Sequence, residues 1–157
     1  LGALGPDARE ITEDEFLLAM HGRRGADKSW LMNQQMLAGL GNIYADEALH
    51  RARIHPLAQP GRVATDAARK LYRAVRQVLD RAVNLQGTTF RDYIDIEGRE
   101  GSYAMRLKVY GRDGEPCRNC RTLIKRIVIA GRSSHFCPQC QPRPRRTAKM
   151  RGPRKRC

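Results

Sequence analysis

The sequence predicts a mainly α fold, in which a helical domain is followed by a small β-hairpin module. Apolar residues recur at helical spacing through much of residues 12–83, which favours helices there. Beyond Gly87, short runs rich in Leu, Ile and Val predict extended chain at Leu107–Tyr110 and Leu123–Ile129. Four of the five cysteines form two Cys-x-x-Cys pairs, one on each side of the second run. A chain of 157 residues has room for two such modules.

The same patterns divide the chain into five segments. Gly and Pro near the start indicate a lead-in or linker, and a polar loop containing Gly98 and Gly101 separates the helical part from the cysteines. Prolines among basic residues at the end predict a tail that is disordered without a partner. The expected segments are residues 1–11 (lead-in), 12–97 (helical domain), 98–106 (polar loop), 107–141 (four-cysteine module) and 142–157 (basic tail).

Two stretches of the helical domain carry local start and turn signals. Thr12-Glu13-Asp14-Glu15 is a capping-box pattern and predicts a first helix at about residues 12–21. Between residues 28 and 56, helical patterns at Gln34–Ala38 and Ile43–Ala52 are separated by Gly39-Leu40-Gly41-Asn42. The paired glycines there mark a sharp turn, because glycine adopts backbone conformations that other residues avoid.

The clearest helix is Thr65–Val83, with Thr65 as its N-cap and Gly87 beyond its end. Its basic residues lie mostly off the apolar stripe. They form either a solvated face or a rail for phosphate groups, and the residues concerned are Arg69, Lys70, Arg73, Arg76 and Arg81.

The net charge of +14 is concentrated at one end of the chain. Residues 1–102 carry equal numbers of basic and acidic side chains, so the whole excess lies in residues 103–157. A basic module and tail point to a polyanionic partner, most often nucleic acid, although a basic face also serves solubility. The sequence shows neither the long apolar run of a membrane span nor a secretory leader. We therefore expect a reducing, cytoplasmic compartment and no membrane partner.

The paired cysteines are spaced as ligands of a metal ion. Each Cys-x-x-Cys turn directs two sulfurs to one point, and a hairpin between two such turns completes a tetrahedron around Zn²⁺. The intervening residues suit this hairpin, with Leu123–Ile129 and Ser133–Phe136 as strands and Gly131 at the turn. Four protein ligands leave no open position, which predicts one structural zinc ion; a redox pair, disulfides or an iron–sulfur cluster are the alternatives. The expected ligands are Cys117, Cys120, Cys137 and Cys140.

A hairpin of this size buries little surface and is suited to presenting basic groups to a phosphate chain. Lys125, Arg126 and Arg132 lie on it. Arg132, at the bend, is the preferred phosphate contact, and the alternative is that it is one surface arginine among many.

Two stretches resemble one known family. The first runs from Met36 to Leu49, through Gly41-Asn42-Ile43-Tyr44, and continues to Ile54-His55-Pro56. The second is Val109-Tyr110-Gly111-Arg112 before the first cysteine pair, with Gly131-Arg132 before the second. Together they resemble the C-terminal half of formamidopyrimidine-DNA glycosylases, which belong to the same family as endonuclease VIII. The resemblance covers about residues 12–141 and implies a helix–two-turn–helix domain followed by a zinc finger.

The resemblance also implies a set of DNA contacts. Asn42, in the turn between two helices, would bond phosphate, and Lys28 and Arg132 would grip the backbone beside an extruded nucleotide. Tyr44, in the same motif, is expected at the DNA-binding surface. Residues 98–106 resemble the loop that covers the extruded base in the formamidopyrimidine branch, which favours that branch, although a mobile surface loop is the alternative. The candidates for base contacts are Thr88, Thr89, Arg99, Ser102 and Tyr103.

The chain departs from the family pattern at its start. The family's nucleophile is an N-terminal proline, whereas this chain begins Leu1-Gly2-Ala3 and its Pro6 is internal. A smaller departure is Asn33, which stands where the family often has Asp. We therefore expect no catalytic residue in these residues, a catalytic N-terminal domain elsewhere in the same protein, and no activity of the chain alone.

By resemblance, the parent protein would be a monomeric bacterial base-excision repair enzyme. It would act as a DNA glycosylase and AP lyase that removes oxidised purines, namely 8-oxoguanine and formamidopyrimidines, and its partner would be double-stranded DNA with such a base or an abasic site. One alternative is a non-catalytic zinc-ribbon module that binds nucleic acid, which has no need of the Gly39–Glu47 motif. Another is an enzyme complete in this chain, but no lysine has an activating arrangement in the sequence.

Overall fold

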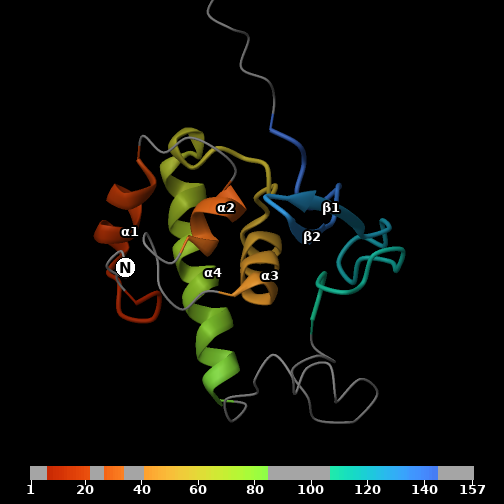
Figure 1. Cartoon of the computed structure of the whole chain (residues 1–157), viewed down its shortest axis with the longest axis horizontal. Helices are drawn as coiled ribbons and strands as arrows, with labels where there is room; N and C mark the ends of the chain where they lie inside the picture. The colour runs from red at the N-terminus through yellow and green to blue at the C-terminus, as the bar shows by residue number, and fades with distance from the viewer. Residues whose placement is uncertain (1–6, 22–26, 34–40, 85–106, 145–157) are drawn as a thin grey trace, which may run out of the picture.

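The computed structural model describes residues 7–21, 27–33, 41–84 and 107–144. Within these ranges the chain forms four α-helices, a short 3₁₀ turn and one antiparallel hairpin (Figure 1). This arrangement confirms a helical part followed by a small hairpin. The elements are α1 (Glu13–Met20), α2 (Asp27–Met32), α3 (Asn42–Ala52), η1 (Pro60–Arg62), α4 (Thr65–Asn84), β1 (Lys125–Ile129) and β2 (Arg132–Phe136).

Local signals account for some helix starts, and the helical pattern predicted at Gln34–Ala38 lies outside the described residues. The Thr12 hydroxyl accepts the Glu15 N–H at 3.2 Å, which confirms the predicted cap of α1. Helix α3 begins at Asn42, after Gly41 in extended conformation. The predicted N-cap of α4 was wrong by one residue: Thr65 is already helical, because the Ala68 N–H donates to the Ala64 carbonyl.

The helical core forms around α4, which lies beside α1 and α3 (Figure 1). Leu71 and Val75 on α4 are buried together with Leu49 on α3. Aromatic rings form the part of the core next to α1, where Phe16 packs edge-on against Trp30 with ring centroids 5.2 Å apart. Helix α3 lies between this core and the hairpin, so one face of α3 is available to position the hairpin.

The hairpin has the register expected of a two-residue turn. Ile129 pairs with Arg132, and the two turn residues, Ala130 and Gly131, have positive φ values of 50° and 78°. Two consecutive residues of this kind form a type I′ turn, whose twist matches that of the strands. Arg132 is therefore the first residue of β2 and lies directly after the turn.

The predicted extended run at Leu107–Tyr110 is not a strand. The Lys108 and Val109 backbone N–H groups donate instead to Oε1 of Glu47 on α3, at 2.6 and 3.5 Å. A carboxylate thus replaces the neighbouring strand that a β ladder requires, and the segment turns. Among the described helices, none combines the length and apolar character needed to cross a membrane.

Candidate metal centre and nucleic-acid interface

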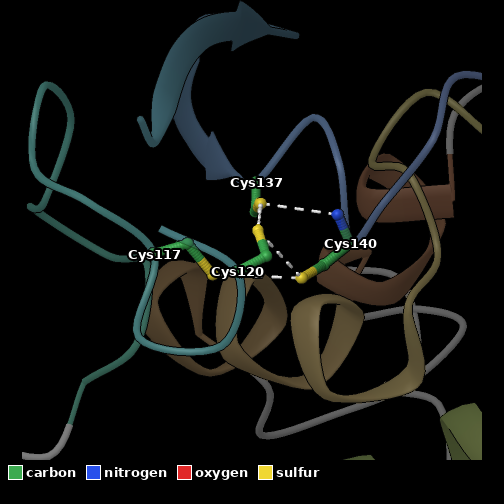
Figure 2. A group of neighbouring side chains, drawn as sticks. All are labelled: Cys117, Cys120, Cys137 and Cys140. Carbon is green, nitrogen blue, oxygen red and sulfur yellow. Dashed lines mark hydrogen bonds between the residues drawn. The ribbon is translucent and has the colours of Figure 1, made fainter. Parts of the chain in front are cut away.

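The four cysteines of the two Cys-x-x-Cys pairs converge on one point (Figure 2). Their sulfurs all lie within 4.8 Å of one another. The separations are 3.4 Å between Cys120 and Cys137, 3.7 Å between Cys120 and Cys140, and 3.9 Å between Cys117 and Cys140. A tetrahedron with metal–sulfur bonds of about 2.3 Å has edges of about 3.8 Å, so the donor set fits Zn²⁺.

This geometry excludes one alternative that the sequence left open, namely disulfides. A disulfide requires about 2.05 Å between sulfurs, and the shortest separation here is 3.4 Å, so these cysteines are not cross-linked. Backbone N–H groups point at sulfur inside each turn, from Asn119 to Cys117 and from Cys140 to Cys137, both at 3.4 Å. The four thiolates therefore hold one structural zinc ion. They fill all four coordination positions, so none is open for catalysis.

The thiols differ in how readily they ionise before metal binds. Burial raises the pKa of Cys140 to about 12 and also raises the pKa of Cys137. Hydrogen bonds from Thr122 lower the pKa of Cys120 to about 6. Since zinc binds the thiolate form, the cation itself supplies the charge that stabilises the buried sulfurs.

The zinc finger is fastened to the helical domain through Gln141. This side chain is buried, accepts the Cys137 backbone N–H at 2.9 Å and donates to the Ile54 carbonyl at 2.9 Å. The amide thus joins the second cysteine turn to the residues that follow α3. Sequence reasoning did not assign this role, because no local pattern links Gln141 to Ile54, which lies 87 residues away.

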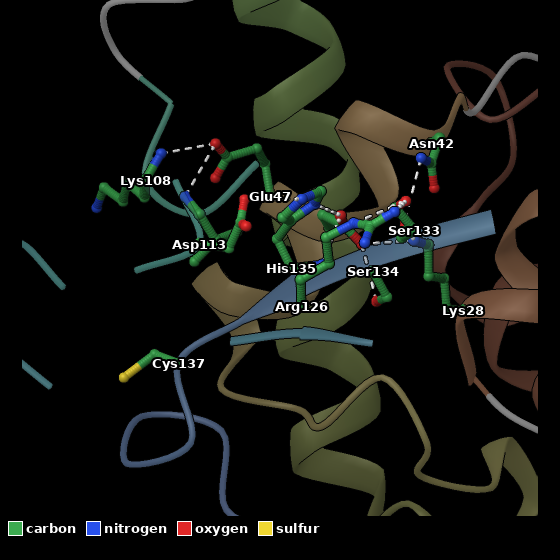
Figure 3. A network of polar contacts seen from close by, with 12 residues as sticks. Lys28, Asn42, Glu47, Lys108, Asp113, Arg126, Ser133, Ser134, His135 and Cys137 are labelled. Carbon is green, nitrogen blue, oxygen red and sulfur yellow. Dashed lines mark hydrogen bonds and ion pairs between the residues drawn. The ribbon is translucent and has the colours of Figure 1, made fainter. Parts of the chain in front are cut away.

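Lys28 and Asn42, predicted as DNA contacts, meet at the same backbone carbonyl of β2 (Figure 3). Lys28 Nζ donates to the Ser133 carbonyl at 2.5 Å, and Asn42 Nδ2 donates to it at 3.2 Å. Ser133 directly follows Arg132, so side chains from α2 and α3 fix the backbone beside the arginine. Lys28 is 1% exposed, whereas Arg132 is exposed.

A small cavity of about 160 Å³ opens at this junction. It lies between α2 and the hairpin turn, and both Lys28 and Arg132 border it. Burial lowers the pKa of Lys28, the ion pair with Asp46 opposes that shift, and the positive charge of Arg132 adds to it. Two cationic groups at one opening make it suited to an anion such as a phosphate. The complete lining is Lys28, Ser29, Met32, Asn33, Ile129, Ala130 and Arg132.

Asp46, one turn after Asn42 on α3, organises this junction. Its Oδ1 lies 2.8 Å from Lys28 Nζ and accepts the Ser134 hydroxyl at 3.2 Å. Its Oδ2 accepts the His135 backbone N–H at 3.0 Å. Residues four apart share a helix face, so Asn42 and Asp46 both meet β2. Sequence reasoning missed Asp46 as a site residue, and this spacing was the available signal.

Of the other predicted contacts, the structure describes Tyr44 but not the candidates for base contacts. Tyr44 is half-buried and packs against the helical core from α3. Asn42 keeps one buried atom, Oδ1, without a hydrogen-bond partner in the described part of the chain. The candidates for base contacts lie outside the described residues, and they are Thr88, Thr89, Arg99, Ser102 and Tyr103.

Family comparisons agree with both parts of the site. Residues 3–93 match the family model of the formamidopyrimidine-DNA glycosylase H2TH domain, and residues 114–143 match the zinc finger found in FPG and IleRS. The formamidopyrimidine-DNA glycosylases of Solibacter usitatus and Heliobacterium modesticaldum are 49% and 47% identical over 140 and 142 residues. Each alignment covers 89% of this chain, and the chain spans about half the length of these relatives, 53% and 51%.

Solved structures give the same result. The MutM (FPG) protein from Thermus thermophilus is 41% identical, with a TM-score of 0.77 over 88% of this chain and 53% of that protein. The Lactococcus lactis Fpg in complex with DNA containing an abasic site is 33% identical, with a TM-score of 0.78 over 89% of this chain and 52% of that protein. The helical part lies within the first matched segment and the four-cysteine hairpin within the second, and the chain belongs to the formamidopyrimidine-DNA glycosylase family.

Proposed function

We propose that this chain supplies the DNA-binding part of a DNA glycosylase and AP lyase that removes oxidised purines from double-stranded DNA. The observation that carries the proposal is that Lys28 and Asn42 both bond the Ser133 carbonyl, next to Arg132, and that Lys28 and Arg132 border one cavity. These groups come from α2, α3 and the zinc finger, so both modules are needed to form one phosphate-binding point.

Phosphate contacts of this kind position DNA without reading its sequence. An exposed arginine offers a planar fork of donors that matches phosphate oxygens. Lys28 is held by Asp46 and the Ser133 carbonyl, which fixes its ammonium group at the cavity wall. The zinc finger keeps the hairpin, and with it Arg132, in place against α3. These features support a fixed clamp for the backbone on either side of an extruded nucleotide.

The catalytic step is assigned to the part of the parent protein that this chain does not span. The chain covers about half the length of its relatives, and the family's proline nucleophile belongs to the N-terminal domain. On this proposal the parent acts as a monomer in the bacterial cytoplasm, removes 8-oxoguanine and formamidopyrimidines, and has a mainly α C-terminal half with the segment boundaries given above. The loop residues Arg99, Ser102 and Tyr103 would contact the base.

Binding and trapping measured together test this proposal. The chain, loaded with zinc, is titrated against duplexes that are undamaged or carry an abasic-site analogue, and a parallel reaction on a true abasic site is treated with borohydride. We expect tighter binding to the abasic-analogue duplex and no covalent adduct. Equal binding to both duplexes would favour a general zinc-ribbon module. A trapped adduct would place a competent amine within these residues and overturn the division of labour.

A further inference from the structure

His50 on α3 faces the zinc centre from the helical side. Its ring is 2% exposed, and its Nε2 lies 3.8 Å from the sulfur of Cys117, 67 residues later in the chain. The other ring nitrogen, Nδ1, is buried and has no hydrogen-bond partner among the described residues. Only one nitrogen of this buried imidazole has a hydrogen-bonding neighbour, which needs an explanation because buried polar groups are normally paired.

The position of the ring proton follows from these surroundings. A neutral imidazole carries one N–H, on either nitrogen. A proton on Nδ1 would be a buried donor without an acceptor, which is rarer in proteins than an unpaired acceptor. A proton on Nε2 points instead at Cys117, whose sulfur is a thiolate, and therefore an acceptor, when it binds zinc.

We propose that His50 is a positioning residue of the zinc site, donating its Nε2–H to the Cys117 thiolate. Four thiolates around one Zn²⁺ leave two excess negative charges, and donors to the sulfurs disperse that charge. Cys117 already receives the Asn119 N–H from its own turn. His50 adds a donor from α3, so the metal site itself is tied to the helix that carries Asn42 and Asp46.

The electrostatic surroundings of the ring support this role. Basic side chains that act on the ring are carried by its own helix, by the residue directly after that helix, and by the segment leading into the first cysteine turn. Positive charge stabilises a nearby anion, and the Cys117 sulfur lies at this ring. The basic residues acting on the ring are Lys108, Arg53, Arg112 and Arg51.

Zinc release is the measurement that tests the proposal. The zinc content of the wild-type chain is measured first and should be one ion per chain. This measurement tests the zinc site itself, separately from the role of His50. The rate of zinc transfer to an excess of a chromogenic chelator is then compared for wild type, His50→Phe and His50→Gln. We expect release to be about 10- to 100-fold faster for His50→Phe. His50→Gln should approach wild type, since its amide N–H reaches the place of Nε2.

His55→Phe is the matched control. His55 is also buried, but its Nδ1 accepts the Leu57 N–H and its ring packs on Phe136, with centroids 4.6 Å apart. Its replacement should lower the melting temperature without the same increase in zinc release. Equal release rates for His50→Phe and wild type would overturn the proposal, as would His50→Gln releasing zinc as fast as His50→Phe.

A second pair of variants keeps the test decisive if His50→Phe fails to fold. His50→Asn is polar but too short to place an N–H at the Nε2 position, so it should release zinc faster than His50→Gln. Cobalt substitution gives an independent readout, because thiolate-to-metal charge-transfer bands respond to hydrogen bonds at sulfur. The bands of His50→Asn should be shifted relative to wild type, whereas those of His50→Gln should lie at the wild-type positions. Identical spectra and identical release rates for Asn and Gln would show that His50 only fills space.

Discussion

Lys28 on α2 and Asp46 on α3 form a 2.8 Å ion pair that is buried from solvent. Lys28 also donates to the Ser133 carbonyl, and Asp46 accepts the His135 backbone N–H, so the pair joins two helices to β2. A buried ion pair gains attraction but loses hydration, and its net stabilisation is small. The main effect of the pair is to hold the hairpin backbone in place beside Arg132.

Breaking this pair should destabilise the fold and weaken DNA binding. Asp46→Ala leaves the Lys28 ammonium buried without a counter-charge, which typically costs about 3–5 kcal/mol. Urea unfolding of the zinc-loaded chain measures the loss. Asp113→Ala, which removes an exposed carboxylate 3.6 Å from His135, is the control and should change the unfolding free energy little. Similar losses for the two variants would show that Asp46 has no special role.

Arg132→Ala should weaken DNA binding while leaving the zinc content at one ion per chain. Arg132 is exposed at the turn and borders the cation-lined cavity, so its loss removes a charged donor to phosphate without disturbing the core. We expect the dissociation constant for the abasic-analogue duplex to rise at least about tenfold. Lys125→Ala, at the opposite end of the hairpin, is the matched control. Equal effects of the two variants would remove Arg132 from the clamp.

Replacing one zinc ligand should unfold the finger and spare the helical part. The buried apolar residues around the four cysteines are few, chiefly Val109 and Ile124, so the metal supplies much of the local stability. Cys137→Ser should therefore lose tightly bound zinc while the helical circular dichroism signal is retained. Cys157→Ser changes the cysteine outside the two pairs and should keep its zinc. Retention of one tight zinc ion by Cys137→Ser would refute the four-cysteine site.

Glu47 should make stability depend on pH. Burial raises its pKa to about 7 from an ordinary value of 4.5, although the Lys108 and Val109 N–H groups oppose the shift. The folded state therefore binds a proton more readily than the unfolded state. The resulting stabilisation is fully present below pH 4.5 and is lost as pH rises to about 7, amounting to about 3 kcal/mol.

Glu47→Gln isolates this effect, because the amide oxygen still accepts an N–H but does not ionise. The difference in unfolding free energy between wild type and Glu47→Gln is measured from pH 4.5 to 8 with zinc in excess. The unfolding free energy of the variant should increase relative to that of wild type as pH rises through this range. Glu115→Gln, which removes an exposed carboxylate, is the control. Parallel curves for wild type and Glu47→Gln would contradict the assignment.

Removal of residues 142–157 should flatten the salt dependence of DNA binding. This tail holds eight basic side chains and no acidic one. Each phosphate contact that is lost reduces the slope of log affinity against log salt concentration by about 0.9. Binding of the full and shortened chains to one duplex is measured across a salt series. An unchanged slope would mean that the tail does not touch DNA, whatever its charge.

Features that depend on neighbours in sequence were predictable from the residues alone. The Thr12 cap needs only the N–H three residues on, and the turn at Ala130-Gly131 directly follows the apolar, β-branched run 127–129. The two Cys-x-x-Cys spacings each build a sulfur pair locally, so the metal and its four ligands were evident. The resemblance added Lys28, Asn42 and Arg132, and the structure places all three around one junction.

What the sequence by itself determined was therefore the order of the modules, the positions of α1, α3 and α4, and the zinc ligands, because each follows from local backbone geometry or short spacing. The tertiary structure decided which polar groups meet across 60 to 90 residues: Glu47 with Lys108, Asp46 with His135, Gln141 with Ile54 and His50 with Cys117. It also overturned the strand at Leu107–Tyr110, since a strand forms only where a partner backbone is available and here a carboxylate takes the N–H groups. Such pairings depend on how α3 packs against the finger, and no local pattern encodes that packing.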